Sequence, residues 1–240
     1  MKVRINKYLA NMGVAARRKV DLMIAGGKVT VGGKKAVLGM MIDPVVDKVV
    51  VSGKTIGQTS EENHKYVILN KPRGVTSTVA DQNAERTVID LVPGRDRLYP
   101  VGRLDKDSEG LIILTNDGEL TNRLTHPKFH VAKTYIVEVQ GNISENKANI
   151  MRSGVKLVDG WTKEAEVTII QHHSNKSKVE IVLFEGRKRQ IRRMAEKLHL
   201  HVLSLRRIKM GSVELGDLQE GKWRNLTASE IAALKKQAGL

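Results

Sequence analysis

The sequence predicts an α+β protein with two parts. Residues 1–60 form a small domain of helices and short strands, and residues 61–240 form a larger domain with a mixed, largely antiparallel sheet flanked by helices. Helical spacing followed by strands at Gly turns predicts the first part, and segments of alternating apolar and polar residues predict the second. Residues 52–64 contain little apolar surface and are the best candidate for a linker.

Two short helices are expected in the first part, over residues 4–12 and 16–25. Their apolar faces consist of Ile5, Leu9 and Met12 in the first helix and of Val20, Met23 and Ile24 in the second. Short strands are expected near residues 28–31 and 48–51. The pair Gly32-Gly33 is typical of a hairpin turn.

The larger domain alternates between strand and helix patterns. Strands are expected at residues 67–69, 98–101, 111–114, 133–139, 164–171, 178–184 and 202–209. Helices are expected at residues 87–91, 117–127 and 144–152, from about residue 187 to about residue 198, and after the capping box that starts at Thr227.

Charge is concentrated in two places. The formal net charge is +15. Residues 1–60 carry 11 Lys and Arg against 3 Asp and Glu, a net +8, and residues 183–209 carry 9 against 2, a net +7. Clustered positive charge predicts a polyanionic partner, of which nucleic acid is favoured. An anionic membrane is the second choice, because neither cluster forms a basic helix with a bulky aromatic face.

Composition limits the remaining classes. The sequence has no cysteine, which excludes disulfides and cysteine metal sites and fits a reducing cytosol. No apolar run approaches the length of a membrane-spanning helix, and the charged N-terminal segment does not look like a secretory signal. His126 has no second histidine or acid at ligand spacing, so we expect no metal site there.

A loop rich in acids precedes the apolar strand expected at residues 111–114. It contains Asp105, Asp107 and Glu109, and such a loop lies at the edge of a core, where a side chain can be held rigidly and still face a cleft. A calcium-binding loop would need a bidentate Glu at its twelfth position, where the sequence has Asn116. A solvated turn and a carboxylate pair for glycoside hydrolysis stay open on spacing alone.

The segment Gly102-Arg103-Leu104-Asp105, followed by Ser-x-Gly-Leu and an apolar strand, resembles the catalytic loop of pseudouridine synthases. The continuation Leu-Thr-Asn-Asp-Gly-Glu is similar to the ribosomal RNA branch, the RsuA/RluB/RluE/RluF family. The resemblance implies that Asp105 is the catalytic residue and that Arg103 supports the site. The turn Lys71-Pro72-Arg73-Gly74 is a further feature that the family shares.

Two downstream motifs carry the same resemblance. Lys133-Thr134-Tyr135 implies that Tyr135 packs against the target base, although a core Tyr with a hydrogen-bonded hydroxyl is the plain alternative. The run Gly186-Arg187-Lys188-Arg189-Gln190-Ile191-Arg192 implies that Arg192 pairs with Asp105. A nearby Arg would keep the carboxylate ionised. Whether Asp105 attacks a carbon or takes a proton stays open.

The first part resembles the alpha-L RNA-binding domain first known from ribosomal protein S-four, over about residues 2–50. The expected RNA contacts are Arg4, Lys7, Arg17, Arg18, Lys19 and Lys28 in this domain and Lys71, Arg187, Lys188 and Arg189 in the larger one. A solvated basic face is the alternative. Basic residues in the first turn of a helix oppose its dipole, which favours a phosphate partner.

The resemblance implies an isomerase that converts a uridine of ribosomal RNA, with the large subunit favoured, into pseudouridine. No cofactor or metal is expected, because the reaction neither adds nor removes atoms. We expect a cytoplasmic monomer whose partner is ribosomal RNA or an assembly intermediate, and no membrane. A non-catalytic RNA-binding or ribosome-assembly protein is the alternative, although such a protein would not need Asp105, Tyr135 and Arg192 together.

Overall fold

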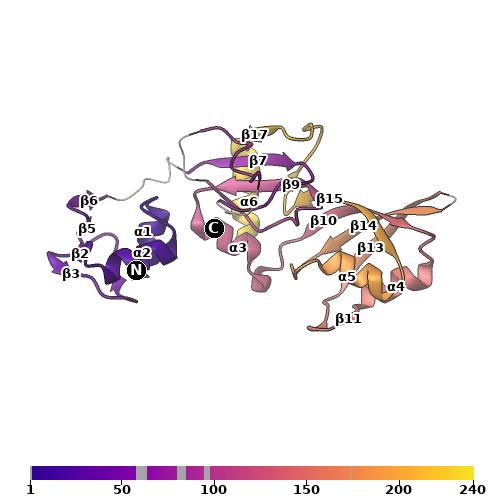
Figure 1. Ribbon diagram of the computed structural model, residues 1–240, viewed down its shortest axis with the longest axis horizontal. Coiled ribbons are helices and arrows are strands. Elements are labelled where there is room, and N and C mark those ends of the chain that lie inside the picture. Colours follow the sequence, from indigo (N-terminus) through magenta and orange to yellow (C-terminus); the bar gives the residue numbers. More distant parts are fainter. Residues whose placement is uncertain (1, 58–63, 80–84, 95–97, 174) are drawn as a thin grey trace. The chain divides into compact units, whose positions relative to one another are not determined.

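The computed structural model describes residues 2–57, 64–79, 85–94, 98–173 and 175–240. The chain divides into two compact units (Figure 1). The smaller unit comprises Met1–His64 with Asn116–Gly118, and the larger comprises Lys65–Thr115 with Glu119–Leu240. Among the described residues, no helix has the length and apolar character needed to cross a membrane.

The smaller unit packs two helices against short strands. Its elements are β1 (Val3–Arg4), α1 (Ile5–Asn11), α2 (Arg17–Ala25), β2 (Val29–Val31), β3 (Lys34–Lys35), β4 (Met41–Ile42), β5 (Val49–Val51) and β6 (Lys54–Ile56). Strands β3-β2-β5-β6 form one sheet, and β1 pairs with β4. Both expected apolar faces are confirmed, since Ile5, Leu9, Val20 and Ile24 are buried and the two methionines pack against them.

Local residue chemistry explains the turn between β2 and β3. Gly32 and Gly33 have φ values of 55° and 82°, and a two-residue hairpin turn of this type needs positive φ at both positions. The hairpin prediction is therefore confirmed. The linker prediction is wrong for its first part, because β6 pairs with β5. Residues 58–63 lie outside the described residues.

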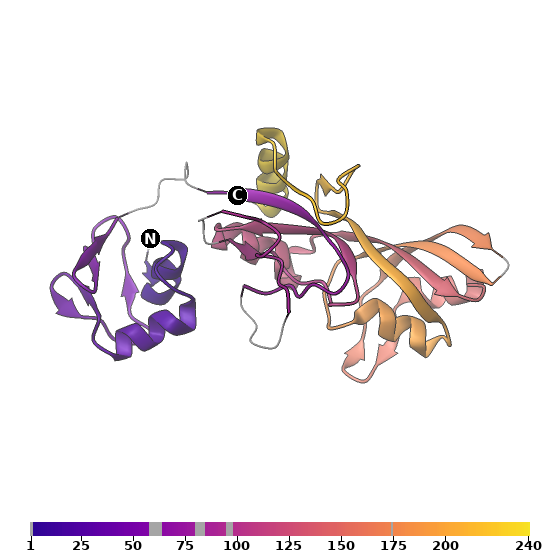
Figure 2. The same cartoon turned by 45° about the horizontal axis from the view of Figure 1, so that its top comes forward.

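The larger unit is built on a sheet of nine strands among the described residues, in the order β13-β14-β10-β15-β9-β7-β17, with β8 on β9 and β16 on β15 (Figures 1 and 2). The strands are β7 (Tyr66–Lys71), β8 (Tyr99–Pro100), β9 (Glu109–Thr115), β10 (Lys133–Gln140), β13 (Ala165–His173), β14 (Lys176–Leu183), β15 (His201–Met210), β16 (Val213–Glu214) and β17 (Trp223–Asn225). Among these pairings only β15 with β9 is parallel. This confirms the mixed, largely antiparallel sheet.

Helices cover different parts of this sheet. They are α3 (Gly118–Thr125), α4 (Glu145–Ser153), α5 (Gln190–Lys197) and α6 (Ala228–Ala238), and the 3-10 helix η2 spans Pro127–Phe129. One core cluster joins α4 and α5 to the sheet, and another joins α3 and α6 to β7 and β9. Strand β9 contributes to both clusters, which explains its continuous apolar sequence. A small hairpin of β11 (Lys156–Leu157) and β12 (Gly160–Trp161) completes the unit.

One helix prediction is wrong. Residues 87–91 form turns, in which the N–H groups of Asp90 and Val92 donate to the carbonyls of Thr87 and Ile89 at 3.2 and 3.1 Å. The Asp90 carboxylate accepts from the N–H and the hydroxyl of Thr87, as at a helix start, but Pro93 follows too soon for a helix to continue. The capping box at Thr227 is confirmed at the start of α6.

Candidate active site

The loop that carries Asp105 is fixed through its backbone. The Ser77 hydroxyl donates to the carbonyl of Leu104 at 2.8 Å and accepts from its N–H at 3.1 Å. On the other side of Asp105, the N–H of Gly74 donates to the carbonyl of Lys106 at 2.8 Å. Asp105 is therefore held from both neighbours, and its side chain takes no part in holding the loop.

Lys71 lies behind this loop and is fully buried. Its amine donates to the carbonyls of Pro72 and Val75 at 2.9 and 2.8 Å, which shapes the turn that carries Gly74. Burial lowers the pKa of this amine to about 8, although the charges of Asp107 and Asp105 oppose the shift. The expected RNA contact of Lys71 is wrong, because its amine is buried, bonds two backbone carbonyls and does not line the cavity.

Asp107, two residues after Asp105, binds two arginines. Nη1 of Arg189 lies 3.0 Å from both carboxylate oxygens, and Nε of Arg192 lies 3.2 Å from one of them. Arg192 also donates to the backbone carbonyl of Asp107 at 3.0 Å. Burial opposes ionisation of Asp107, but the Arg189 hydrogen bond and the two guanidinium charges outweigh it and lower its pKa.

This geometry corrects the predicted pairing of Arg192. Among the described residues, the ion pair of Arg192 is with Asp107 and not with Asp105. The two acids lie on the same loop two residues apart, so the motif alone could not separate them. Arg192 still lines the cavity that holds Asp105.

Two adjacent strands supply the floor of this cavity. Tyr135 on β10 and Arg207 on β15 are directly paired, and on the other side Arg207 pairs with Gly110 of β9. A Cβ at Gly110 would clash with the backbone oxygen of Arg207 and would lie 2.8 Å from its backbone nitrogen, and Gly110 has a φ of 102°. Glycine at this position therefore lets β9 and β15 lie close together beneath the cavity.

Two buried cations belong to this floor. Arg207 is 1% exposed, and its Nε donates to the carbonyl of Leu111 at 2.7 Å. Its Nη2 has no hydrogen-bond partner among the described residues. The Lys133 amine donates to the carbonyl of Val131 at 2.9 Å, and burial together with the charge of Arg207 lowers its pKa to about 8. Both residues line the cavity.

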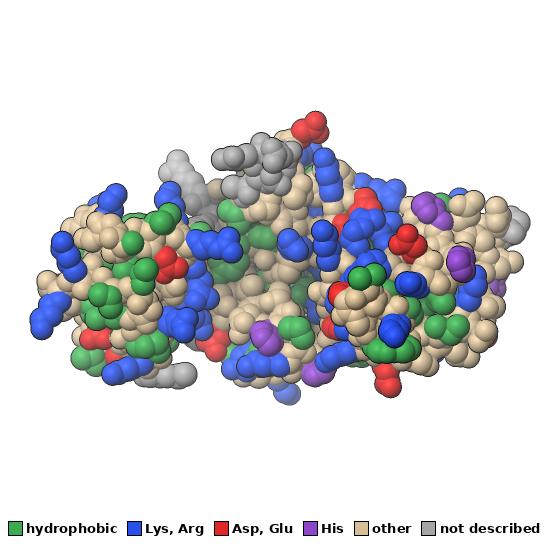
Figure 3. All heavy atoms as spheres, turned by 60° about the horizontal axis from the view of Figure 1, so that its bottom comes forward, with side chains coloured by type: hydrophobic (Ala, Val, Ile, Leu, Met, Phe, Trp, Pro, Cys, Tyr) green, Lys and Arg blue, Asp and Glu red, His purple; other side chains and the backbone are tan. Residues whose placement is uncertain are grey.

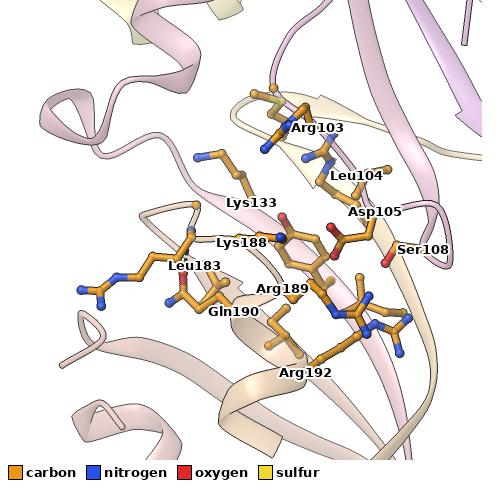
Figure 4. A pocket seen from close by; sticks show the side chains of 18 of the residues that line it. Arg103, Leu104, Asp105, Ser108, Lys133, Leu183, Lys188, Arg189, Gln190 and Arg192 are labelled. Atoms are coloured by element: carbon orange, nitrogen blue, oxygen red, sulfur yellow. Dashed lines mark hydrogen bonds between the residues drawn. The ribbon is translucent and has the colours of Figure 1, made fainter. Parts of the chain in front are cut away.

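The cavity has a volume of about 250 Å³. Among the described residues that line it, the cationic side chains are Arg103, Lys133, Arg187, Lys188, Arg189, Arg192 and Arg207, and the one acid is Asp105. Apolar contacts come from Leu104, Tyr135, Leu183, Ile191, Leu205 and Met210. Figure 4 shows the Asp105 carboxylate pointing into the cavity. Among the described residues this carboxylate has no hydrogen bond or ion pair, so both oxygens are available to a bound molecule.

The structure brings most of the expected residues of the larger unit together. Asp105, Tyr135, Arg192, Arg103, Arg187, Lys188 and Arg189 all line the cavity, and Lys71 does not. In the smaller unit, Arg4, Arg17, Arg18, Lys19 and Lys28 are exposed and Lys7 is half-buried. Figure 3 shows Lys and Arg side chains scattered over the face that it draws of the smaller unit and gathered in part of that of the larger unit.

Sequence reasoning missed Lys133, Arg207 and Ser77. Lys133 stands on the inward face of its strand, two residues before Tyr135, and Arg207 stands two residues after the buried Leu205. A cation at a core-facing position of a strand is a recognisable signal, since unpaired cations are seldom buried. Nothing in the sequence marks Ser77, whose partner is 27 residues away.

The cavity combines one carboxylate, which has no partner among the described residues, with several cationic side chains, and this arrangement is suited to chemistry on a polyanion. The family model for RNA pseudouridylate synthase matches residues 65–197, and the model for the S4 domain matches residues 3–44. The chain belongs to the RNA pseudouridine synthase family, and it carries an N-terminal S4 domain. The predicted family, fold class and enzyme class are confirmed, and a non-catalytic role on the same scaffold is set aside.

Individual relatives cover nearly the whole chain. An Aquifex aeolicus protein named "Uncharacterized RNA pseudouridine synthase" is 39% identical and covers 100% of this chain and 96% of its own length. "Ribosomal large subunit pseudouridine synthase B" of Bacillus subtilis is 36% identical over 98% of this chain and 96% of its own. A crystal structure of a pseudouridylate synthase has a TM-score of 0.70 and 31% identity, covering 97% of this chain and 99% of that chain.

Proposed function

We propose that this pseudouridine synthase isomerises a uridine of ribosomal RNA, with large-subunit RNA as its substrate, and that Asp105 is the catalytic carboxylate. The observation that carries the assignment of Asp105 is its position. It is the one acid that lines a cationic cavity, and its oxygens are uncommitted while its backbone is fixed on both sides. The name of the Bacillus subtilis relative supports the choice of substrate.

The reaction breaks the bond from a ring nitrogen to the ribose, turns the uracil and joins a ring carbon to the ribose instead. That carbon loses a proton and the nitrogen gains one, so atoms balance without a co-reactant. Asp105 serves as nucleophile or as base in this sequence. Tyr135 supplies an apolar ring against which the displaced uracil packs, and such stacking offsets the cost of removing a base from its helix.

In this proposal the cationic side chains of the cavity and its rim bind the RNA. A target nucleotide brings a phosphate and two uracil carbonyls to the cavity. Lys133 and the unpartnered Nη2 of Arg207 are donors for such oxygens. Around the rim, the exposed Arg103, Lys188 and Arg189 would bind flanking phosphates, while Arg4, Lys7, Arg17, Arg18, Lys19 and Lys28 of the S4 domain would bind RNA elsewhere. We place the enzyme in the cytoplasm as a monomer that acts on ribosomal RNA or an assembly particle.

The test uses large-subunit ribosomal RNA transcribed in vitro and carbodiimide labelling of pseudouridine, read by primer extension. Asp105→Asn should form no pseudouridine and should still bind the transcript, because Asn keeps the shape and loses the charge. The matched control is Glu109→Gln at the start of β9, whose carboxylate lies 4.0 Å from Arg73 and outside the cavity, and this variant should keep its turnover. Wild-type turnover by Asp105→Asn would refute the assignment of Asp105.

The choice of substrate has its own readout. Pseudouridines mapped in both ribosomal RNAs from a strain without this protein should show one missing position in the large subunit. A missing position in the small subunit would correct the substrate and leave the reaction intact.

A further inference from the structure

We propose that the β11–β12 hairpin presents Trp161 as a stacking platform for an unpaired RNA base next to the target nucleotide. The inference extends the proposed function from the cavity to the RNA that flanks it, and it rests on that function. Trp161 is 62% exposed, in a chain with only 3% aromatic residues. Nothing in the catalytic assignment uses this side chain.

The hairpin is short, yet it is firmly attached to the wall of the cavity. Two-residue strands are not stable alone. Arg187, which lines the cavity, donates to the backbone carbonyls of Asp159 and Gly160 at 3.4 and 3.2 Å and also to that of Trp161. Arg193 of α5 binds the Asp159 carboxylate at 2.8 and 3.3 Å.

These contacts change the role of Arg187. Sequence patterns assign it to an RNA phosphate, whereas its guanidinium is occupied by the hairpin and by Glu185 at 3.3 Å. The Arg187 side chain therefore reaches from the wall of the cavity to the backbone of Trp161. An RNA strand with one nucleotide in the cavity passes over such a distance within a few nucleotides.

The surroundings of Trp161 favour RNA as the occupant. Lys156 is paired with Trp161 across the hairpin, and Lys163 follows two residues later. Exposed and buried side chains alternate along both strands of the hairpin. The exposed side chains of Lys156, Trp161 and Lys163 therefore lie on one face, and the buried ones of Leu157 and Thr162 lie on the other.

An exposed aromatic ring with lysines on the same face is suited to single-stranded nucleic acid, and the Lys163 amine lies 3.4 Å from Nδ1 of His130, which leaves it donors for a phosphate. The ring stacks on a base and the cations neutralise the adjacent phosphates. A protein partner would be served by a wider apolar patch, whereas Lys156 and Lys163, which share the face of Trp161, are charged and Val158 at the turn is the one other exposed apolar side chain of this hairpin.

The backbone at this face is also fixed. The N–H of Lys163 donates to the buried Glu185 carboxylate at 2.9 Å, and Gln190 of α5 donates to the same oxygen at 2.8 Å. Because Gln190 lines the cavity, one carboxylate connects the platform to the active site. A platform held this rigidly loses little conformational freedom when a base stacks on it.

Tryptophan fluorescence of the full chain tests the proposal. The sequence has two tryptophans, so the conservative change Trp223→Phe leaves Trp161 as the only emitter. Single-stranded oligouridylate should quench this emission, and duplex RNA should not, because its bases are already stacked. Unchanged emission on saturation with oligouridylate would overturn the proposal.

Affinity provides the second readout. Trp161→Ala should weaken binding of oligouridylate by roughly 5- to 150-fold, the value of one stacked base, and leave duplex binding unchanged. Trp161→Phe should retain most of the affinity. The matched control is Val158→Ala, which removes part of a fully exposed apolar side chain from the same hairpin. Equal affinity of wild type and Trp161→Ala would refute a stacking role.

Turnover on the ribosomal RNA transcript separates this inference from the proposed function. Trp161→Ala should raise KM for the transcript and leave kcat unchanged, because the platform binds flanking RNA and does not touch the reacting base. If wild type forms pseudouridine and Trp161→Ala has the same KM, the inference fails alone. If wild type forms none while oligouridylate quenches Trp161, the proposed substrate fails and the platform stands.

Discussion

Replacement of Lys133 by Met should stabilise the protein at neutral pH and reduce its activity. Lys133 is 9% exposed, and its pKa is lowered from 10.5 to about 8, chiefly by burial. A difference of about 2.5 pKa units corresponds to about 3 kcal/mol of unfavourable free energy for burying the charged amine. Met keeps the apolar stem and removes this cost. It also leaves the carbonyl of Val131 without its donor, which destabilises the variant by about 1 kcal/mol.

The sign of the pH dependence follows from the two pKa values. Below about pH 8, Lys133 is protonated in the folded and the unfolded protein, so the full cost is present. Between about pH 8 and pH 10.5 only the unfolded chain keeps this proton, and the free energy of unfolding rises by up to about 1.4 kcal/mol per pH unit. The Met variant lacks this rise. It should be more stable than wild type by about 2 kcal/mol near neutrality and less stable at the alkaline end.

Urea unfolding followed by circular dichroism across this pH range measures the difference. The difference between wild type and variant isolates Lys133 from Lys71, which titrates in the same range. Lys176→Met on strand β14 is the control, because Lys176 is exposed and a surface substitution there should change the free energy of unfolding by less than about 0.5 kcal/mol. A pH-independent difference for Lys133→Met would refute the buried, titrating amine. Turnover should fall in the same variant, as it does when a residue serves binding at the expense of stability.

Three further outcomes test the geometry around the loop and the S4 domain. Arg192→Met and Asp107→Asn should show a coupling free energy above about 0.5 kcal/mol in a double-mutant cycle on unfolding, whereas Arg192→Met and Asp105→Asn should add within about 0.3–0.5 kcal/mol. Ser77→Ala leaves a buried N–H and carbonyl unpaired, so it should cost roughly 1–3 kcal/mol and lower kcat more than it changes KM. Changing residues 17–19 together to Ala should weaken RNA binding and reduce the salt slope by about 0.7–0.9 for each phosphate that the variant no longer binds.

Where the sequence succeeds, the signal is either periodic or long. Ile5 and Leu9 stand one helical turn apart and both are fully buried, so the spacing alone placed α1. The loop around Asp105 matches a family pattern over many residues, and it leads into a strand buried on both faces. Such signals depend on neighbours in the chain, which the sequence displays directly.

Where the sequence fails, the deciding partner is far away along the chain. Lys71 is at the end of a strand and beside a Pro-containing turn, a place that looks exposed, and only the packing of the Asp105 loop over it explains its burial. Arg192 could reach either of two acids, and the loop conformation decides between them. That conformation depends on Ser77 and Gly74, whose contacts with the loop no local pattern reveals.

The two acids of this loop have divided roles for a physical reason. A carboxylate bound by two guanidinium groups is strongly stabilised in its charged form, which makes Asp107 a poor nucleophile and a poor base. Asp107 binds Arg189 and Arg192 and so keeps both cations close to the cavity. Neither oxygen of Asp105 has a hydrogen bond or ion pair among the described residues. A pairing of Arg192 with Asp105 itself would have to be broken before that carboxylate could react, and the observed arrangement avoids this cost.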